Sequence, residues 1–115
     1  MTYEAIDPHS GVSIRRYATL STEELRAALH RSERAFQSWR RTSFQERAGV
    51  LMNLAERLRS SVDEHARLMA QEMGKPYTAG RAEAEKCAWV CEYYAQRGEA
   101  FLDDEPADTE ATRSY

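Results

Sequence analysis

The stretch from residue 78 to residue 102 constrains the fold most, because it predicts one long helix with apolar side chains on two faces. One face carries, at helical spacing, Cys87, Val90, Cys91, Tyr94 and Phe101. The second face carries Ala82, Lys86, Trp89 and Tyr93. A surface helix shows a single apolar stripe, whereas a helix that is apolar on two sides is enclosed by neighbours. We therefore expect this helix to need more packing partners than the rest of the chain supplies.

Length and composition bound the class of protein. The chain has 115 residues, which is one domain at most or a piece of a larger one. Its net charge of -3 and its lack of a basic stripe speak against nucleic acid as a partner. No apolar run reaches the length of a membrane span, and no signal peptide is visible at the N-terminus. Two cysteines do not make a disulfide framework, so we expect a cytoplasmic, reducing setting.

The periodicity predicts a mostly α-helical chain that begins with a β-hairpin. The hairpin is expected over residues 3–17, with a turn in which Asp7-Pro8 opens the connection and Gly11 takes a positive φ. About four helices are expected to follow, over residues 22–40, 44–60, 62–73 and 78–102, with an acidic linker over 103–115. The end of the linker, residues 112–115, would suit the beginning of a strand. A lone hairpin is marginal in water, so it must pair with, or lie upon, something else.

Helix start and stop signals set these boundaries. Capping boxes are predicted to begin at Ser21, Ser43 and Ser61, each with a glutamate three residues later, and Thr78 can cap the last helix. Gly74 fits the left-handed position that ends a helix, and Pro76 cannot continue one. The faces expected to be buried in the second and third helices consist of Ala48, Leu51, Leu54, Ala55, Leu58, Val62, Ala66, Met69 and Met73.

Most candidate sites have a structural interpretation that is the better one. Cys87 and Cys91 could hold half of a metal site, but the three histidines are scattered, so two small buried hydrophobic side chains are favoured. No histidine follows a glutamate by three residues, as a carboxylate-bridged metal bundle requires. The arginines between residues 31 and 47 straddle two helix ends and favour a structural role over an anion site. Gly74-Lys75 lacks the remaining positions of a phosphate loop.

Lys86 is the residue with the strongest functional interpretation. It lies in a row of otherwise small or aromatic side chains, so its ammonium could meet an anionic ligand group if that row lines a cavity. The alternative is a lysine whose ammonium extends to the solvent at the helix surface.

Two segments carry a resemblance to a known family, Glu72-Met73-Gly74-Lys75-Pro76 and the run KCAWVCEYYA at residues 86–95. Here the chain resembles the N-terminal part of an aldehyde dehydrogenase, and most closely a bacterial NAD(P)-dependent succinate-semialdehyde dehydrogenase. The hairpin turn, the run AFQSW at residues 35–39 and the run QER at residues 45–47 follow in the order of the family. The resemblance covers nearly all of this chain but only a minor fraction of a complete family member.

The resemblance implies an oxidoreductase that converts an aldehyde to a carboxylic acid with NAD or NADP. It implies a parent enzyme of the α/β aldehyde dehydrogenase fold that is a homo-oligomer and acts on a small-molecule aldehyde such as succinate semialdehyde. It also implies that the nucleophilic cysteine, the general base and the cofactor site lie outside residues 1–115. We therefore expect no catalytic, cofactor-binding or metal-binding residue within this chain, and no activity from it alone.

One pair of site residues is carried over through the resemblance. The family's matching segment places Ala82 and Lys86 where its long helix borders the substrate tunnel. Two other classes of protein stay open from the residues themselves: a free-standing helical interaction module without catalysis, and a regulatory helical bundle that binds an anionic metabolite.

Overall fold

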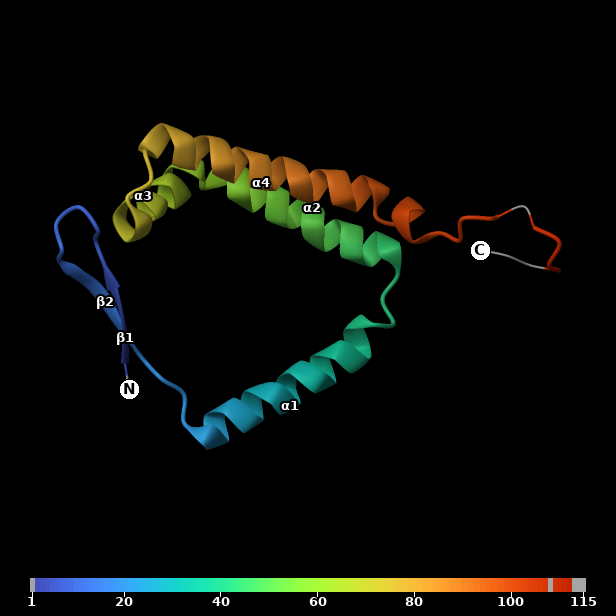
Figure 1. Cartoon of the computed structure of the whole chain (residues 1–115), viewed down its shortest axis with the longest axis horizontal. Coiled ribbons are helices and arrows are strands. Elements are labelled where there is room, and N and C mark those ends of the chain that lie inside the picture. The colour runs from blue at the N-terminus through green and yellow to red at the C-terminus, as the bar shows by residue number, and fades with distance from the viewer. Residues whose placement is uncertain (1, 108, 113–115) are drawn as a thin grey trace.

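The computed structural model describes residues 2–107 and 109–112 and confirms a mostly helical chain that begins with a hairpin (Figure 1). Strands β1 (Thr2–Ile6) and β2 (Ser13–Ala18) form a two-stranded antiparallel sheet. Helices α1 (Thr22–Trp39), α2 (Phe44–Ser60), α3 (Val62–Met73) and α4 (Tyr77–Arg97) follow, with a short 3-10 helix η1 (Ala100–Leu102). The expected acidic linker covers residues 103–115, of which residues 108 and 113–115 lie outside the described residues. The expected strand start at 112–115 therefore lies almost wholly outside them.

The hairpin forms for the reasons that its turn sequence predicts. The Asp7 carboxylate accepts a hydrogen bond from the backbone amide of His9 at 2.8 Å and another from the Ser10 hydroxyl at 2.9 Å. Gly11 takes the expected positive φ of 72°. Across the strands Glu4 faces Arg16, and their side chains pair at 2.9 Å.

Two of the three predicted capping boxes are confirmed. Ser21 and Ser43 each accept from the amide of a glutamate three residues later, at 3.2 Å, and the glutamate carboxylate accepts from the serine amide at 2.7 Å. The box at Ser61 was wrong, because α2 runs almost directly into α3 and Ser61 makes no side-chain cap. Its amide instead donates to the Arg57 carbonyl at 3.1 Å. The cap at Thr78 was also wrong, since α4 already begins at Tyr77, directly after Pro76.

The core is small and is made by α2, α3 and α4. Its buried apolar side chains are Ala55, Val62, Ala66, Ala84 and Ala88. Gly80 is also buried, and a Cβ built on it would lie 3.1 Å from the Cα of Ala66. Small residues therefore let the backbones of α3 and α4 approach closely, and these helices pack through alanine and glycine rather than through large side chains.

This core corrects several burial expectations. Helix α4 packs through Gly80, Ala84 and Ala88, which neither predicted face contained, because small residues were not counted as packing positions. Cys87 is exposed and Cys91 is half-buried, so only Cys91 fits the interpretation as a packed hydrophobic side chain. Leu54 and Met73 were expected inside, but they are exposed. The helix also ends at Arg97 rather than at residue 102, with a separate turn after it.

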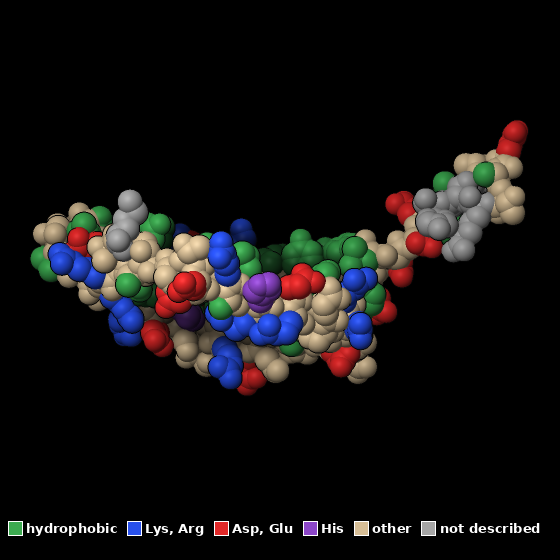
Figure 2. Space-filling model, turned by 90° about the horizontal axis from the view of Figure 1, so that it is seen from below, with side chains coloured by type: hydrophobic (Ala, Val, Ile, Leu, Met, Phe, Trp, Pro, Cys, Tyr) green, Lys and Arg blue, Asp and Glu red, His purple; other side chains and the backbone are tan. Residues whose placement is uncertain are grey.

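The chain is open rather than closed around its core (Figure 1). Most of the hairpin and of α1 lies apart from the layer of α2, α3 and α4, although the hairpin turn comes close to the end of α3, where a Cβ built on Gly74 would lie 3.2 Å from Cγ of Pro8. The principal extents are 66 × 41 × 26 Å. Helix α1 has no buried residue, although Leu25, Leu29, Phe36 and Trp39 lie along it at helical spacing. Seen from below, Lys/Arg and Asp/Glu side chains are interspersed without a large field of one sign (Figure 2). Among the described residues no helix is long and apolar enough to cross a membrane.

Candidate functional site

A hollow on the surface of α4 contains both residues that were predicted to face a substrate. Its lining is Ala82, Glu83, Lys86, Cys87 and Val90, and its volume is about 480 Å³. All five come from successive turns of one helix, since residues three and four apart share a face. Ala82 and Lys86 thus lie together, as the helical spacing predicts. Trp89 and Tyr93, expected in the same row, are not part of this lining, although their rings contact each other with centroids 5.8 Å apart.

Of the two charged side chains that line this hollow, one has an ion-pair partner and the other has none among the described residues. Glu83 forms a close ion pair with the ammonium of Lys75, which lies in the short connection between α3 and α4. Lys86, by contrast, has no carboxylate within ion-pair distance among the residues that the structure describes. The ammonium of Lys86 is therefore the free charge of the hollow, and a small residue, Ala82, lies one turn before it.

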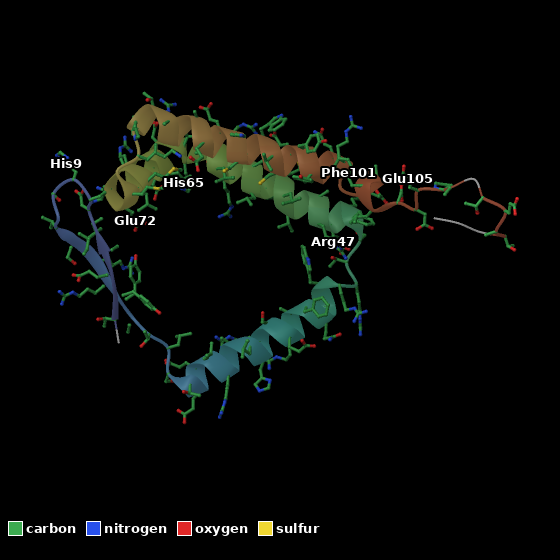
Figure 3. All side chains as sticks on the ribbon, in the orientation of Figure 1. His9, Arg47, His65, Glu72, Phe101 and Glu105 are labelled. Carbon is green, nitrogen blue, oxygen red and sulfur yellow. The ribbon has the colours of Figure 1, made fainter. Side chains whose placement is uncertain are left out.

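A second hollow lies between the start of α2 and the end of α4. It has a volume of about 580 Å³ and is lined by Phe44, Gln45, Arg47, Ala48, Leu51, Tyr94, Ala95, Gln96, Gly98, Glu99 and Leu102. Its cation is already in use, because Arg47 donates to the Thr42 hydroxyl at 3.0 Å and to the Thr42 carbonyl at 3.1 Å. The guanidinium also lies over the rings of Trp39 and Phe44. Figure 3 labels Arg47 at this end of the molecule, close to Phe101. Arg47 thus has the structural role that was favoured for the arginines of this region.

A third hollow is polar, with its two arginines paired. Arg59, Val62, Arg81 and Glu85 line about 480 Å³. Arg59 forms a bidentate pair with Glu92, which raises the pKa of Arg59 and lowers that of Glu92. Arg81 lies 3.2 Å from the carboxylate of Asp63. These pairs connect α4 to α2 and to α3, so neither arginine of this hollow is free to meet an anionic ligand.

The N-terminus of α4 is held to α3 by a tyrosine. The Tyr77 hydroxyl donates to the Asp63 carboxylate at 2.8 Å, and this hydrogen bond raises the pKa of Tyr77. Because Asp63 also pairs with Arg81, three side chains link the start of α4 to the start of α3.

The Gly74–Lys75 turn does not offer a cradle for a dinucleotide, and the described residues do not offer a metal site. Among them, no group of three His, Cys, Asp or Glu side chains comes close enough to hold a metal ion. A pyrophosphate needs free backbone amides at a glycine-rich turn. At Gly74 and Lys75 the amides are already used, donating to the Ala70 carbonyl at 3.0 Å and to the Met69 carbonyl at 3.3 Å. The Gly74–Lys75 turn therefore does not fit the pyrophosphate of NAD or NADP.

Comparison with known proteins decides the family. A profile described as the "Aldehyde dehydrogenase family" matches residues 1–115, the whole chain. The chain belongs to the aldehyde dehydrogenase family. This aldehyde dehydrogenase segment is 40% identical over 108 residues to "Succinate-semialdehyde dehydrogenase [NADP(+)] 1" of Mycobacterium tuberculosis, with 94% of the segment and 24% of that protein covered. It is 36% identical over its whole length to the "Probable succinate-semialdehyde dehydrogenase [NADP(+)]" of Synechocystis sp., of which it covers 25%.

Solved structures of aldehyde dehydrogenases agree with the fold of this segment. The succinic semialdehyde dehydrogenase of Streptococcus pyogenes, solved in complex with NADP+, superposes with a TM-score of 0.88 at 28% identity. The match covers 96% of this segment and 25% of that chain. The segment therefore spans about a quarter of the length of the dehydrogenases that it matches. The resemblance read from the sequence is confirmed.

Some residues of the α4 hollow were missed from the sequence. Glu83, Cys87 and Val90 lie next to, or one turn from, Ala82 and Lys86, so the same helical spacing could have found them. The pairing of Lys75 with Glu83 had no such signal, because it crosses the break between two helices and depends on how the chain turns there.

Proposed function

We propose that this chain is the N-terminal portion of an NAD(P)-dependent aldehyde dehydrogenase that oxidises succinate semialdehyde to the carboxylic acid. The support is the family membership over the whole chain, together with relatives that carry this activity in their names. In the complete enzyme, residues outside this chain would hold NAD or NADP, which would supply the hydride acceptor. The residues of this chain contribute to substrate selection and not to bond making.

The observation that carries the proposal is the unpaired ammonium of Lys86 in the α4 hollow. Succinate semialdehyde carries a carboxylate at the end remote from its aldehyde. An unpaired ammonium beside a small residue, Ala82, leaves room for that carboxylate and attracts it. Lys86 would therefore bind and orient the carboxylate end of the substrate at the mouth of the tunnel, while the aldehyde end points further into the tunnel.

Neither cysteine of the chain is the nucleophile in this proposal. Cys87 and Cys91 lie in the middle of α4, away from a helix N-terminus, and no histidine lines the hollow with Cys87. A reactive thiolate needs a nearby base or positive helix end that stabilises it. We infer that the segment alone is inactive and that its hairpin and helices pack on the other parts of a dehydrogenase subunit. A homo-oligomer and a cytoplasmic location stay predictions.

Helix α1 supports this proposal over a free-standing helical module. A self-sufficient module would cover its apolar stripe, but Leu29 and Phe36 of α1 remain 63% and 52% exposed. Exposed apolar stripes of this kind mark surfaces that other protein elements cover.

The test is the substitution Lys86→Met in the full-length dehydrogenase that carries this segment. We expect KM for succinate semialdehyde to rise about tenfold, because a charge-assisted contact is lost. KM for butanal, which has no carboxylate, should change far less. Arg97→Met is the matched control, since it removes an exposed cation from the last turn of α4 without touching the hollow. Equal effects of Lys86→Met on both aldehydes would remove the proposed role of Lys86.

A further inference from the structure

Two charged side chains, Glu83 and Lys86, line the α4 hollow, and a third from outside it, Lys75, pairs with only one of them. Glu83 and Lys86 lie three residues apart on one helix, a spacing at which a carboxylate and an ammonium commonly pair. Glu83 instead pairs with Lys75, from outside the helix. Lys86 is left without a carboxylate partner among the residues that the structure describes. Lys75 thus competes with Lys86 for the same carboxylate and holds it.

The backbone between α3 and α4 puts Lys75 in this place. Gly74 ends α3 in the left-handed conformation, with φ 68°, and Pro76 starts α4 with φ −54°. A left-handed residue reverses the chain direction, and Gly adopts it without a steric penalty. Lys75 therefore sits at the reversal, where its side chain can reach Glu83 on the second turn of α4. The pair is partly shielded, because the side chain of Lys75 is 25% exposed and that of Glu83 is 49% exposed.

We propose that Lys75 is a positioning residue for substrate selection: by holding Glu83, it keeps the ammonium of Lys86 available for the carboxylate of a carboxylated aldehyde. This inference rests on the proposed function. Lys75 itself does not line the hollow and does not touch the substrate. It acts through Glu83, which would otherwise pair with Lys86 and repel the incoming carboxylate.

The proposal predicts that substrate preference depends on the summed charge of three side chains. Lys75, Glu83 and Lys86 together carry a net charge of about +1 at neutral pH. Lys75→Met lowers this charge to about zero and frees the Glu83 carboxylate. Adding Glu83→Gln to that variant returns the charge to about +1 and removes the competitor. The preference for the carboxylated aldehyde should therefore depend on the net charge of these three positions and not on whether residue 75 is a lysine.

The experiment measures kcat and KM for succinate semialdehyde and for butanal in the full-length dehydrogenase and its variants. The readout is the KM for succinate semialdehyde divided by the KM for butanal. Lys75→Met should raise this ratio about threefold, as expected for one partly exposed charge, and should act on KM more than on kcat. The double variant Lys75→Met/Glu83→Gln should return the ratio to that of the unchanged enzyme. A double variant whose ratio stays as high as that of Lys75→Met would overturn the proposal, because Lys75 would then act through the backbone turn.

A second variant keeps the test decisive if Lys75→Met does not fold. Glu83→Gln alone retains the turn and the cation, so it should leave the ratio equal to or below that of the unchanged enzyme. A ratio raised by Glu83→Gln would overturn the proposal.

Failure of the proposed function gives a different result from failure of the role proposed for Lys75. If Lys86→Met leaves the preference for the carboxylated aldehyde intact, Lys86 has no role there. If only Lys86→Met affects it, the role of Lys86 stands and that of Lys75 falls.

Discussion

Gly80 determines how closely α4 approaches α3. Its position is buried, and an added Cβ would meet three atoms of Ala66 at 3.1 to 3.4 Å. Gly49, on α2, is also helical, but an added Cβ there would meet nothing within 4 Å. The two glycines thus have opposite roles, since one permits a close helix contact and the other only lowers helix propensity.

Gly80→Val should therefore destabilise the 115-residue chain by about 1–3 kcal/mol, because the extra methyl groups force α3 and α4 apart. Gly49→Ala is the matched control and should stabilise the chain by about 0.5–1 kcal/mol through helix propensity. Thermal unfolding followed by circular dichroism measures both. Unchanged stability in Gly80→Val would show that the two helices do not pack through this glycine.

The candidate site was predictable from the sequence only where it follows the period of one helix. Ala82 and Lys86 lie one turn apart, and the structure brings them into one hollow, as that spacing predicts. The charge state of the hollow was not predictable, because the partner of Glu83 lies across the Gly74 reversal. Whether Ala82 and Lys86 face substrate stays a prediction that kinetics must test.

At the scale of the elements, α1 and α2 each begin with a reciprocal cap. At the start of α2 the Ser43 amide and hydroxyl both donate to the Glu46 carboxylate, and these hydrogen bonds hold the pKa of Glu46 below its ordinary value of 4.5. The cap of α1 lowers the pKa of Glu24 in the same way. A carboxylate with a lowered folded-state pKa stabilises the fold above its ordinary pKa. This contribution is lost as the pH falls through the lowered value.

Ser43→Ala should destabilise α2 by about 1 kcal/mol at neutral pH, because the first turn loses its cap. The pKa of Glu46 should then rise only in part, because the amide at position 43 still donates to its carboxylate, so the loss of stability on acidification should become somewhat smaller than in the unchanged chain. Ser60→Ala is the control, since the Ser60 hydroxyl donates only to the Arg57 carbonyl at the other end of α2. Thermal unfolding over a pH series measures both variants. An undiminished acid sensitivity in Ser43→Ala would exclude the Ser43 hydroxyl as its source.

The elements themselves were largely predictable, because caps, breakers and helical period act over a few residues. The errors came where a neighbouring element decides the outcome. Ser61 has the sequence of a cap, yet α2 runs almost directly into α3, and the Ser61 amide donates to the Arg57 carbonyl while its side chain makes no capping hydrogen bond. Pro76 already sets the first turn of α4, which leaves Thr78 inside the helix. The packing face of α4 was missed because alanine and glycine bury little area, although they allow close approach.

At the scale of the whole molecule, many more large apolar side chains are exposed than are buried in the core. The buried side chains are an alanine set with one valine, whereas Leu29, Phe36 and Trp89 are about half exposed or more. The hairpin and α1 have little contact with the layer of α2, α3 and α4 (Figure 1). Sequence periodicity could predict an apolar stripe on α1, but not whether the covering element belongs to this chain.

Leu29→Ser tests whether elements outside this chain cover the apolar stripe of α1 in the complete enzyme. In the 115-residue chain Leu29 is 63% exposed and not packed in the core, so the substitution should change the free energy of unfolding by less than about 0.5 kcal/mol. It should also lower the binding of a hydrophobic dye. In the full-length dehydrogenase the same substitution should cost about 2 kcal/mol, since we expect α1 to be covered there. Val62→Ala is the control, because Val62 is only 7% exposed in this chain and should cost about 1–3 kcal/mol in both proteins. An equally small effect of Leu29→Ser in both proteins would mean that α1 keeps its apolar face in water in the complete enzyme, and the packing proposed for this segment would have to exclude it.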